Sequence, residues 1–503
     1  MTNILEYLEN SVAHHRDKLA FASGEMEMTF GELYEKARAI GTEICKLSIY
    51  KRPIVVFMEK CPNMIAAFLG VTYSGNYYVP LDSEIPAFRI QLILQAVNPA
   101  LIICDETTQE LLEGWGLPYE HETFSDLCIC PIVSDKLISQ VRRQAVDVDP
   151  LYIVFTSGST GVPKGVVASH KSVIDYTESL ENVLAAGPKT VFGMQSPLYL
   201  DACLKEIMLT LKLGATTHFV PPSLFMFPVK LVEFLNQKGI NTICWVSSAL
   251  GLIAGLGALD KAVPEALHTI AFTSEVLPVK HFNKWREVVP SARFVHLYGP
   301  TEATGVSTYY LPDRFFEEGE SIPIGQPFPN TGIVLVDDNN QVPDVGQPGE
   351  IYIRGGRLSL GYFNDPDKTR AAFVQNPLSD FPDTVYKTGD LGYKDKNGNL
   401  YFISRRDHQI KHMGYRIELA EIEWVAARSA LVELACAVFD GEKSRIILYY
   451  TGSLDTAAVK AYLKANLPRY MMPFAVFPLE TLPLTPGGKL DRAGLLQTYK
   501  GGK

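Results

Sequence analysis

A run of small and hydroxyl residues separates two apolar stretches near residue 160. Thr156-Ser157-Gly158-Ser159-Thr160-Gly161 is followed by Lys164, and the apolar stretches 151–155 and 166–168 flank it. Such residues free backbone N–H groups and add hydroxyl donors, and the lysine adds a positive charge, which together suit a phosphate group. The Gly-Lys-Ser/Thr of a Walker A loop is absent at the required spacing, so this is a phosphate loop of another kind. A flexible Ser/Gly linker is the alternative, but the flanking strand patterns argue against it.

Three further stretches could hold a nucleotide or a metal ion. Tyr298 and Glu302 enclose a Gly-Pro-Thr turn, which brings a flat ring close to a carboxylate for a hard cation such as Mg²⁺. Asp390 follows a Thr-Gly turn and could accept hydrogen bonds from a sugar diol. Lys489 follows two glycines and could reach into a cleft. Taken singly, each has an ordinary alternative: a surface turn, a surface acid or a solvated lysine.

Asp201 stands at the start of an amphipathic segment, residues 201–213. We expect one helix over the whole segment, because four apolar residues have helical spacing: Leu204, Ile207, Met208 and Leu211. A carboxylate at a helix N-terminus suits the helix dipole, which by itself explains an aspartate there. Lys205 lies four residues further on and shares the flank of the apolar stripe.

Strand and helix patterns alternate through the first 150 residues, which predicts a parallel sheet with helices on both faces. We expect helices at 30–47, 63–74 and 89–97, and strands at 54–58 and 101–104. After the phosphate loop come further strand patterns, at 239–248, 268–273 and 294–297. Ligands bind at the carboxyl ends of such strands.

From Ile324 onward, glycine and proline become frequent and short strands alternate with turns, which predicts a small β-rich subdomain. The polar break at 404–407 is a candidate hinge, and the residues after it read as a compact α+β domain. We therefore expect an α/β protein with a large N-terminal domain of α/β sheets at 1–404, including the β-rich subdomain at about 324–404. A small mobile C-terminal domain follows at 405–503, with Asp407 near the hinge.

The composition is typical of a soluble globular protein, with 47% hydrophobic and 20% charged residues among 503. No apolar run is long enough to span a membrane and no basic-then-apolar leader begins the chain, so we expect a cytoplasmic protein without membrane insertion. The eight cysteines are scattered without a CxxC pair, which favours reduced thiols.

The net charge of −10 argues against nucleic-acid binding. Residues 405–503 hold 14 Lys and Arg against 10 Asp and Glu, and this net +4 suits an acidic partner.

Taken together and in order, these stretches resemble the adenylate-forming enzymes, a superfamily that includes acyl- and aryl-CoA ligases and nonribosomal-peptide adenylation domains. The match covers essentially the whole chain. It is carried by segments 156–165, 298–302, 386–390, 404–419, 467–473 and 487–492. Three positions depart from the usual pattern: Ser404 and Gly487 replace Gly and Asn, and His296 replaces a common Asn.

The resemblance implies that a carboxylate attacks the α-phosphate of ATP·Mg²⁺ to give an acyl-adenylate, from which a thiol then displaces AMP. Lys489 would bridge the substrate carboxylate and the nucleotide, Glu302 would hold Mg²⁺, and Asp407 would be the pivot of the C-terminal domain. Lys411 would be a second catalytic residue, and Gly414 would line the thiol tunnel. The resemblance assigns to ATP binding Thr156, Ser157, Gly158, Ser159, Thr160, Gly161, Lys164, His296, Leu297, Tyr298, Gly299, Pro300, Thr301, Asp390 and Arg405.

In amino-acid-activating members, an Asp at the position of Asp201 pairs with the substrate ammonium, and an unpaired buried carboxylate there would be costly. The resemblance therefore indicates a small amino-acid substrate, an acidic phosphopantetheinylated carrier protein as partner, and a monomer. By motif register the substrate pocket comprises Asp201, Ala202, Lys205, Trp245, Ala271, Thr273, Leu297, Gly305 and Val306.

Within the superfamily the chain looks most like the D-alanine–D-alanyl carrier protein ligase branch. That branch usually has Cys where Thr273 stands and an apolar residue where Lys205 stands. Lys205 could bind the carboxylate of an acidic amino acid, or it could form an ion pair with Asp201 or Glu206. Two other functions stay open: a CoA ligase of a small carboxylic acid, and a non-catalytic relative that only binds nucleotide.

Overall fold

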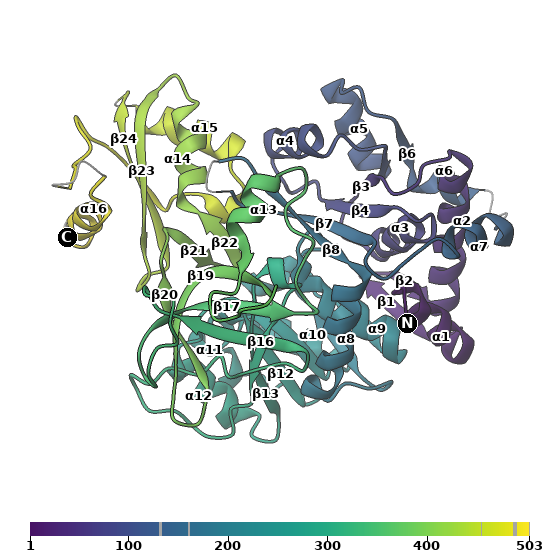
Figure 1. The fold of residues 1–503 in the computed structure, drawn as a ribbon, viewed down its shortest axis with the longest axis horizontal. Helices are drawn as coiled ribbons and strands as arrows, with labels where there is room; N and C mark the ends of the chain where they lie inside the picture. The colour runs from purple at the N-terminus through teal and green to yellow at the C-terminus, as the bar shows by residue number, and fades with distance from the viewer. Residues whose placement is uncertain (130–132, 159–160, 454, 486–489, 502–503) are drawn as a thin grey trace. The chain divides into compact units, whose positions relative to one another are not determined.

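The computed structural model describes residues 1–129, 133–158, 161–453, 455–485 and 490–501 (Figure 1). The chain divides into two compact units. The first unit comprises Met1–Ser83, Asn98–Val154 and Val166–Ser404, and the second comprises Glu84–Val97, Phe155–Gly165 and Arg405–Lys503. The second unit thus contains two earlier segments besides residues 405–503, and the expected domains at 1–404 and 405–503 stay a prediction.

A nine-stranded sheet forms one part of the first unit, in the order β15-β14-β13-β12-β11-β9-β10-β1-β2. The strands from β1 to β13 that neighbour one another in this order pair in parallel, apart from the antiparallel β1–β2 pair. The bounds are β1 (Leu19–Ser23), β2 (Met26–Thr29), β9 (Val191–Met194), β10 (Thr216–Phe219), β11 (Thr242–Val246), β12 (Thr269–Thr273), β13 (Arg293–Tyr298), β14 (Thr308–Tyr310) and β15 (Gln326–Pro327).

Helices bury both faces of this sheet. On one face the apolar core includes side chains of α8 (His170–Leu184) and α9 (Leu204–Leu213). On the other face a second core includes side chains of α10 (Pro228–Gln237), α11 (Ser247–Gly255) and α12 (Val279–Val288). The expected α/β class with helices on both faces is confirmed.

A six-stranded sheet has the order β6-β5-β3-β4-β7-β8. Its bounds are β3 (Pro53–Phe57), β4 (Tyr77–Leu81), β5 (Leu101–Cys104), β6 (His121–Thr123), β7 (Pro150–Thr156) and β8 (Lys164–Ser169). The remaining helices of this part are α1 (Leu5–His15), α2 (Phe30–Lys46), α3 (Pro62–Tyr73), α5 (Glu106–Trp115), α6 (Phe124–Ile129) and α7 (Asp135–Arg142).

Helix α2 begins where the sequence supplies a capping box. Thr29 accepts a hydrogen bond from the Glu32 N–H at 3.2 Å, and the Glu32 carboxylate accepts one from the Thr29 N–H at 2.8 Å. The helix then lies close against α3 through glycine: a Cβ added at Gly70 would lie 2.5 Å from a methyl carbon of Ile40. A larger residue at this position would push the two helices apart.

The expected β-rich region is an antiparallel sheet in the order β16-β17-β19-β18, with β20 paired to β19. The bounds are β16 (Thr331–Val336), β17 (Gly349–Gly355), β18 (Phe373–Gln375), β19 (Thr384–Lys394) and β20 (Leu400–Arg405), with α13 (Pro366–Ala372) before β18.

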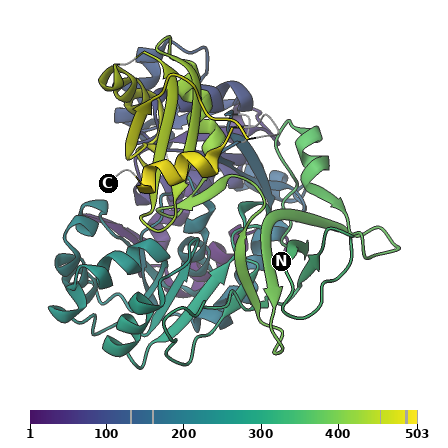
Figure 2. The ribbon, with the colours of Figure 1, turned by 90° about the vertical axis from the view of Figure 1, so that its left-hand side faces the viewer.

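The second unit contains the hairpin of β21 (Gln409–His412) and β22 (Tyr415–Glu418), and the sheet β23-β24-β25. Helix α16 packs against this sheet (Figure 2). Its Leu495 shares a buried apolar cluster with residues of β23 and β24. The other bounds are α4 (Ala87–Val97), α14 (Leu419–Ala427), β23 (Val432–Asp440), β24 (Arg445–Gly452), α15 (Thr456–Asn466), β25 (Ala475–Pro478) and α16 (Arg492–Gly501).

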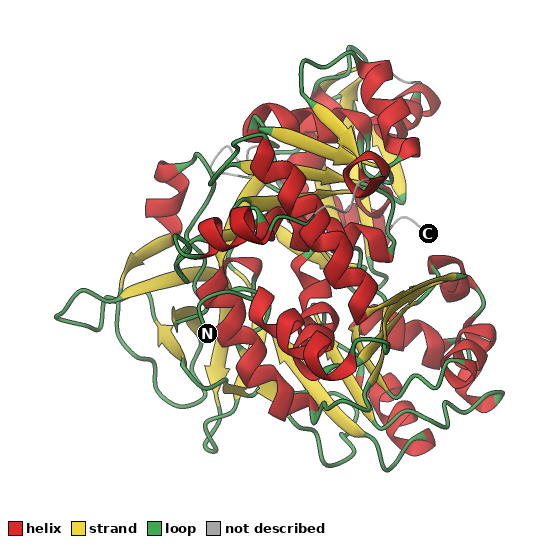
Figure 3. Cartoon of the chain, turned by 90° about the vertical axis from the view of Figure 1, so that its right-hand side faces the viewer, coloured by secondary structure: helices red, strands yellow, loops and turns green. Residues whose placement is uncertain are grey.

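Figure 3 shows the helices in red and the strands in yellow. Among the described helices, none combines the length and the apolar character that a bilayer crossing requires. The seven cysteines that the structure describes are free thiols, as the sequence predicts.

Candidate active site

Two of the predicted nucleotide ligands meet in the first unit. Tyr298 is the last residue of β13, and its hydroxyl donates a 2.5 Å hydrogen bond to Oδ2 of Asp390 in β19. Both side chains are buried, and 92 positions separate them in the chain. The Asp390 N–H donates to the Thr388 hydroxyl at 2.9 Å, which fixes the strand locally. A ring face and a carboxylate therefore lie together, which suits a base and a ribose diol.

Glu302 lies in a 3₁₀ turn that follows β13. Its side chain is fully buried, and Oε1 accepts a 2.7 Å hydrogen bond from the Tyr362 hydroxyl. The turn is tight, because a Cβ added at Gly299 would lie 2.6 Å from the Val306 Cα. Pro300 and Thr301 complete the connection to Glu302.

The donor set fits a magnesium ion that is shared with phosphate. Among the described residues no group of three or more His, Cys, Asp or Glu side chains could hold a metal ion. Mg²⁺ is commonly bound by one or two carboxylates together with substrate phosphates, so a single buried carboxylate such as Glu302 is sufficient.

The phosphate loop begins at Thr156, the last residue of β7. The Thr156 hydroxyl is buried, and no described residue hydrogen-bonds to it. The loop is compact: the Gly161 N–H donates to the Gly158 carbonyl at 3.0 Å, and a Cβ at Gly158 would lie 1.9 Å from the Val162 carbonyl oxygen. Lys164 starts β8. The predicted ligands Ser159 and Thr160 lie outside the described residues.

In the second unit, the predicted pivot Asp407 forms a double ion pair with Arg405. Nε and Nη2 of Arg405 donate to the two carboxylate oxygens, each at 2.7 Å. Burial raises the pKa of the Asp407 carboxyl, but the guanidinium and the Gln409 N–H outweigh this effect and hold the pKa below its usual value. Such a fork-to-fork pair orients both side chains.

The hairpin β21–β22 carries two further predicted residues. Lys411 lies opposite Arg416 in the register, and Gly414 in the connecting turn has a φ of +82°, which favours glycine. The predicted catalytic residue Lys489 lies outside the described residues, so its assignment stays a prediction.

On the substrate side, Asp201 and Ala202 lie in a 3₁₀ turn, and α9 begins only at Leu204. We expected a single helix over 201–213, but its first turn, 201–203, is a 3₁₀ turn that precedes α9. Lys205 is only 2% exposed, and its ammonium donates to the Ala202 carbonyl at 2.5 Å. In the part of the chain that the structure describes, Lys205 and Glu206 form no ion pair, although the Lys205 charge acts on the Glu206 carboxylate electrostatically.

Glu206 is a buried acid that the sequence analysis considered only as a partner of Lys205. Its side chain is fully buried, and neither carboxylate oxygen has a hydrogen-bond partner among the described residues. Burial raises the pKa of this carboxyl to about 7, although Lys205 and Lys60 act in the opposite direction. Glu206 therefore keeps its proton to a higher pH than an exposed glutamate does.

Strand register separates the predicted pocket residues into two groups. Ala271 pairs with Val295, so Ala271, Thr273 and Leu297 share one face of the sheet. Trp245 pairs with Phe272 and faces the other side, where it packs on Phe225 with ring centroids 5.4 Å apart. The structure does not bring Trp245 together with the other pocket residues. On the Ala271 face, β11 instead presents Cys244, which lies in the same apolar core as Ala271 and Leu297.

His296 also lies on the face opposite Leu297. It stacks on Phe272 with centroids 4.6 Å apart, and its Nδ1 lies 2.7 Å from the Pro323 carbonyl oxygen. This position gives His296 a clear packing role beside the predicted nucleotide residues.

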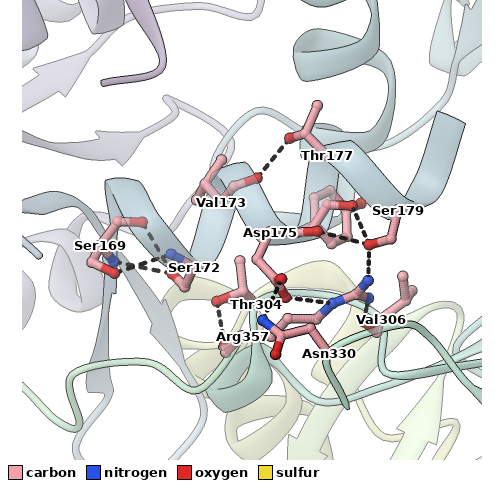
Figure 4. Close-up of polar contacts among 11 residues, drawn as sticks. Ser169, Ser172, Val173, Asp175, Thr177, Ser179, Thr304, Val306, Asn330 and Arg357 are labelled. Carbon is pink, nitrogen blue, oxygen red and sulfur yellow. Dashed lines mark hydrogen bonds and ion pairs between the residues drawn. The ribbon is translucent and has the colours of Figure 1, made fainter. Parts of the chain in front are cut away.

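Arg357 is a fully buried arginine that no sequence pattern marks as functional (Figure 4). Its Nη1 donates to the Val306 carbonyl at 2.6 Å, and its Nε contacts Asp175 at 3.2 Å. The Thr304 hydroxyl donates to the Arg357 carbonyl at 2.8 Å. These bonds hold the loop that carries Gly305 and Val306. An arginine directly after two glycines and before an apolar residue is the only local signal, and it indicates no particular partner.

Comparison with known proteins agrees with this geometry. A family model described as AMP-binding enzyme matches residues 8–363. The D-alanine–D-alanyl carrier protein ligase of Bacillus licheniformis is 30% identical over 521 residues, covering 98% of both chains. The dimodular nonribosomal peptide synthase of Bacillus subtilis is 32% identical, over 98% of this chain.

The chain spans only 21% of the length of that synthase. Among solved structures, holo-PA1221, a nonribosomal peptide synthetase protein containing adenylation and PCP domains, has a TM-score of 0.84 at 25% identity. That alignment covers 99% of this chain and 84% of the other. The chain therefore belongs to the AMP-binding enzyme family.

Proposed function

We propose that the chain is an AMP-forming ligase that activates an amino acid with ATP and transfers it to the phosphopantetheine thiol of a carrier protein. The observation that carries this proposal is the buried hydrogen bond between Tyr298 and Asp390, which joins two predicted nucleotide motifs. The end-to-end similarity to a D-alanine–D-alanyl carrier protein ligase supports the same reaction.

In the first half-reaction an oxygen of the substrate carboxylate attacks the α-phosphorus of ATP. A new O–P bond forms while the bond from this phosphorus to the bridging oxygen of pyrophosphate breaks. Such a transfer needs positioning and charge neutralisation more than acid–base chemistry. The loop from Thr156 to Lys164 and Lys489 would orient the phosphates, and Glu302 would hold Mg²⁺, which neutralises phosphate charge when bound.

In the second half-reaction the thiol sulfur attacks the carbonyl carbon of the aminoacyl-adenylate. A C–S bond forms, the C–O bond to AMP breaks, and the thiol proton passes to solvent. Lys411 and Gly414 lie on the hairpin that the resemblance assigns to this step, with Asp407 as the pivot.

The test is to incubate the protein with ATP, Mg²⁺ and hydroxylamine, and to offer in turn each of the twenty L-amino acids and D-alanine. We expect AMP and an aminoacyl hydroxamate to appear with at least one of them, because hydroxylamine traps the adenylate. Product only with fatty or aryl acids would instead identify a CoA ligase of an amine-free acid. ATP binding without any product would indicate a non-catalytic nucleotide-binding protein.

D-alanine is one candidate substrate, and an acidic amino acid is a second, favoured by Lys205. This ammonium is 2% exposed and contacts one backbone carbonyl, and a buried charge is costly without a counter-ion. A substrate side-chain carboxylate would supply that counter-ion. In the same assay, Lys205→Met should reduce the yield with glutamate or aspartate by about 100-fold and spare neutral amino acids. Product with D-alanine in the unaltered protein, with none from glutamate or aspartate, would favour D-alanine.

The partner we propose is an acidic carrier protein, because residues 405–503 hold a net charge of +4. We also propose that the protein is a monomer and that it acts in the cytoplasm. The free thiols of the described cysteines support this compartment.

A further inference from the structure

Within the second unit, one hydroxyl of the phosphate loop is bound to a C-terminal strand. The Ser157 hydroxyl donates to the Arg416 carbonyl at 2.7 Å and accepts from the Glu418 N–H at 3.2 Å. Its only proton is therefore committed to β22. Gly161 of the same loop lies against Trp424, because a Cβ there would lie 2.3 Å from Trp424 Cγ.

A second junction in this unit joins α4 to the helix that carries Trp424. Arg89 of α4 forms an ion pair with Glu421 of α14, and the two side chains are 8% and 4% exposed. Beside this pair, Phe88 stacks on Trp424 with ring centroids 6.1 Å apart and 24° between the planes. The guanidinium of Arg428 lies over both rings, at 5.3 and 4.9 Å from their centroids.

These contacts form one continuous path. Arg89 holds Glu421 on α14, the next turn of α14 presents Trp424, and Trp424 meets Gly161 of the loop. The Glu418 N–H, just before α14 begins, holds the other end of the loop at Ser157. Removing one partner of such a deeply buried ion pair leaves the other charge buried without compensation, which is strongly destabilising.

The Ser157 hydroxyl cannot donate to a phosphate oxygen while its proton is committed to the Arg416 carbonyl. If the proposed function holds, phosphates occupy the loop in the first half-reaction and have left as pyrophosphate before the second. We propose that Ser157 exchanges a phosphate for β22 between the two half-reactions. Arg89 and Glu421 act as positioning residues that favour the β22-bound arrangement and thereby the thiol transfer.

The experiment measures the half-reactions separately, with the amino acid that gives the most hydroxamate. Adenylation is followed by ATP–pyrophosphate exchange, and transfer by single-turnover thioester formation on free pantetheine. We expect Arg89→Met to slow transfer by about 10- to 100-fold and to leave exchange within about twofold. The charge swap Arg89→Glu with Glu421→Arg should recover most of the transfer rate. Lys500→Met, which removes an exposed ion pair with Glu442 in the same unit, should change neither rate.

Equal losses in both half-reactions, without recovery in the swap, would show that the junction only stabilises the fold and would overturn the proposal. Unchanged transfer in Arg89→Met would overturn it as well. Absence of exchange in the unaltered protein with every amino acid would instead refute the proposed function, so the two failures are distinguishable.

Discussion

Lys205 and Glu206 are adjacent, buried and oppositely charged, yet the structure does not pair them. Because helical neighbours point about 100° apart, adjacent residues do not face each other, and the Lys205 ammonium turns back to the Ala202 carbonyl instead. The sequence could place both residues on the same buried segment. It could not show that the carboxylate would remain without a hydrogen-bond partner among the described residues, since that depends on packing from α8 and β11.

The raised pKa of Glu206 predicts a pH-dependent stability. The folded protein keeps the proton up to about pH 7, whereas the unfolded chain releases it near 4.5, the ordinary pKa of a glutamate. Stability therefore falls as pH rises between these values, by roughly 3 kcal/mol in total. Glu206→Gln abolishes this titration, so its melting temperature relative to the unaltered protein should rise from pH 5 to pH 8. A pH-independent difference between the two proteins would contradict the assignment.

Tyr298→Phe should weaken ATP use without disturbing the fold. The change removes the 2.5 Å hydrogen bond to the buried Asp390 carboxylate, so that this acid is less well positioned for a ribose. Hydrogen bonds to charged groups contribute about 1.5–3 kcal/mol, so KM for ATP in pyrophosphate exchange should rise about 10- to 100-fold. Tyr401→Phe is the matched control, because it also removes one tyrosine hydroxyl. Tyr401 stacks on Tyr393 and is not among the predicted nucleotide residues. Equal effects of the two substitutions would argue against a nucleotide role for Tyr298.

At the scale of elements, local patterns predicted most helices and strands. The helix expected at 30–47 is α2, and the apolar runs at β3 and β5 marked buried parallel strands. The segment 201–213 has helical periodicity throughout, but periodicity does not distinguish a 3₁₀ first turn from an α-helical one. The strand expected at 239–248 ends at Val246, where Ser247 begins α11 and donates to the Glu275 carbonyl at 2.8 Å.

The Trp245 side chain lies on the face of β11 opposite Ala271, and this orientation can be tested by substitution. Its indole N–H donates to the Gly193 carbonyl at 2.7 Å and ties β11 to β9, on the face opposite Ala271. Trp245→Phe should therefore lower the free energy of unfolding by about 1–2 kcal/mol and leave the order of preferred amino acids unchanged. Denaturant titration and an amino-acid panel measure the two quantities. Cys244→Ala, on the Ala271 face, is the comparison that should alter preference.

A changed amino-acid preference in Trp245→Phe, with stability retained, would restore Trp245 to the pocket. The motif register alone could not decide this point. A shift of one residue moves a strand side chain to the opposite face, and no local signal in residues 239–248 fixes that register.

At the scale of the whole molecule, the change of composition after residue 324 led us to expect a β-rich subdomain, and the polar break at 404–407 led us to expect a hinge. The second unit resumes at Arg405, and the domain bounds 1–404 and 405–503 stay a prediction. The sequence did not indicate that 84–97 and 155–165 pack with the C-terminal residues. Ser157 and Arg416 are 259 positions apart, and no periodicity or composition links such distant residues. The mobility of the C-terminal domain and the pivot at Asp407 stay predictions.

The central claim is that the whole chain activates an amino acid, with Asp201 as the counter-ion of its ammonium. The most direct test is amino-acid-dependent ATP–pyrophosphate exchange in the unaltered protein and in Asp201→Ala. We predict exchange with at least one α-amino acid and a loss of kcat/KM of about 100-fold or more in the variant, because the substrate ammonium loses its counter-ion. Exchange supported only by amine-free acids, and unaffected by Asp201→Ala, would contradict the account.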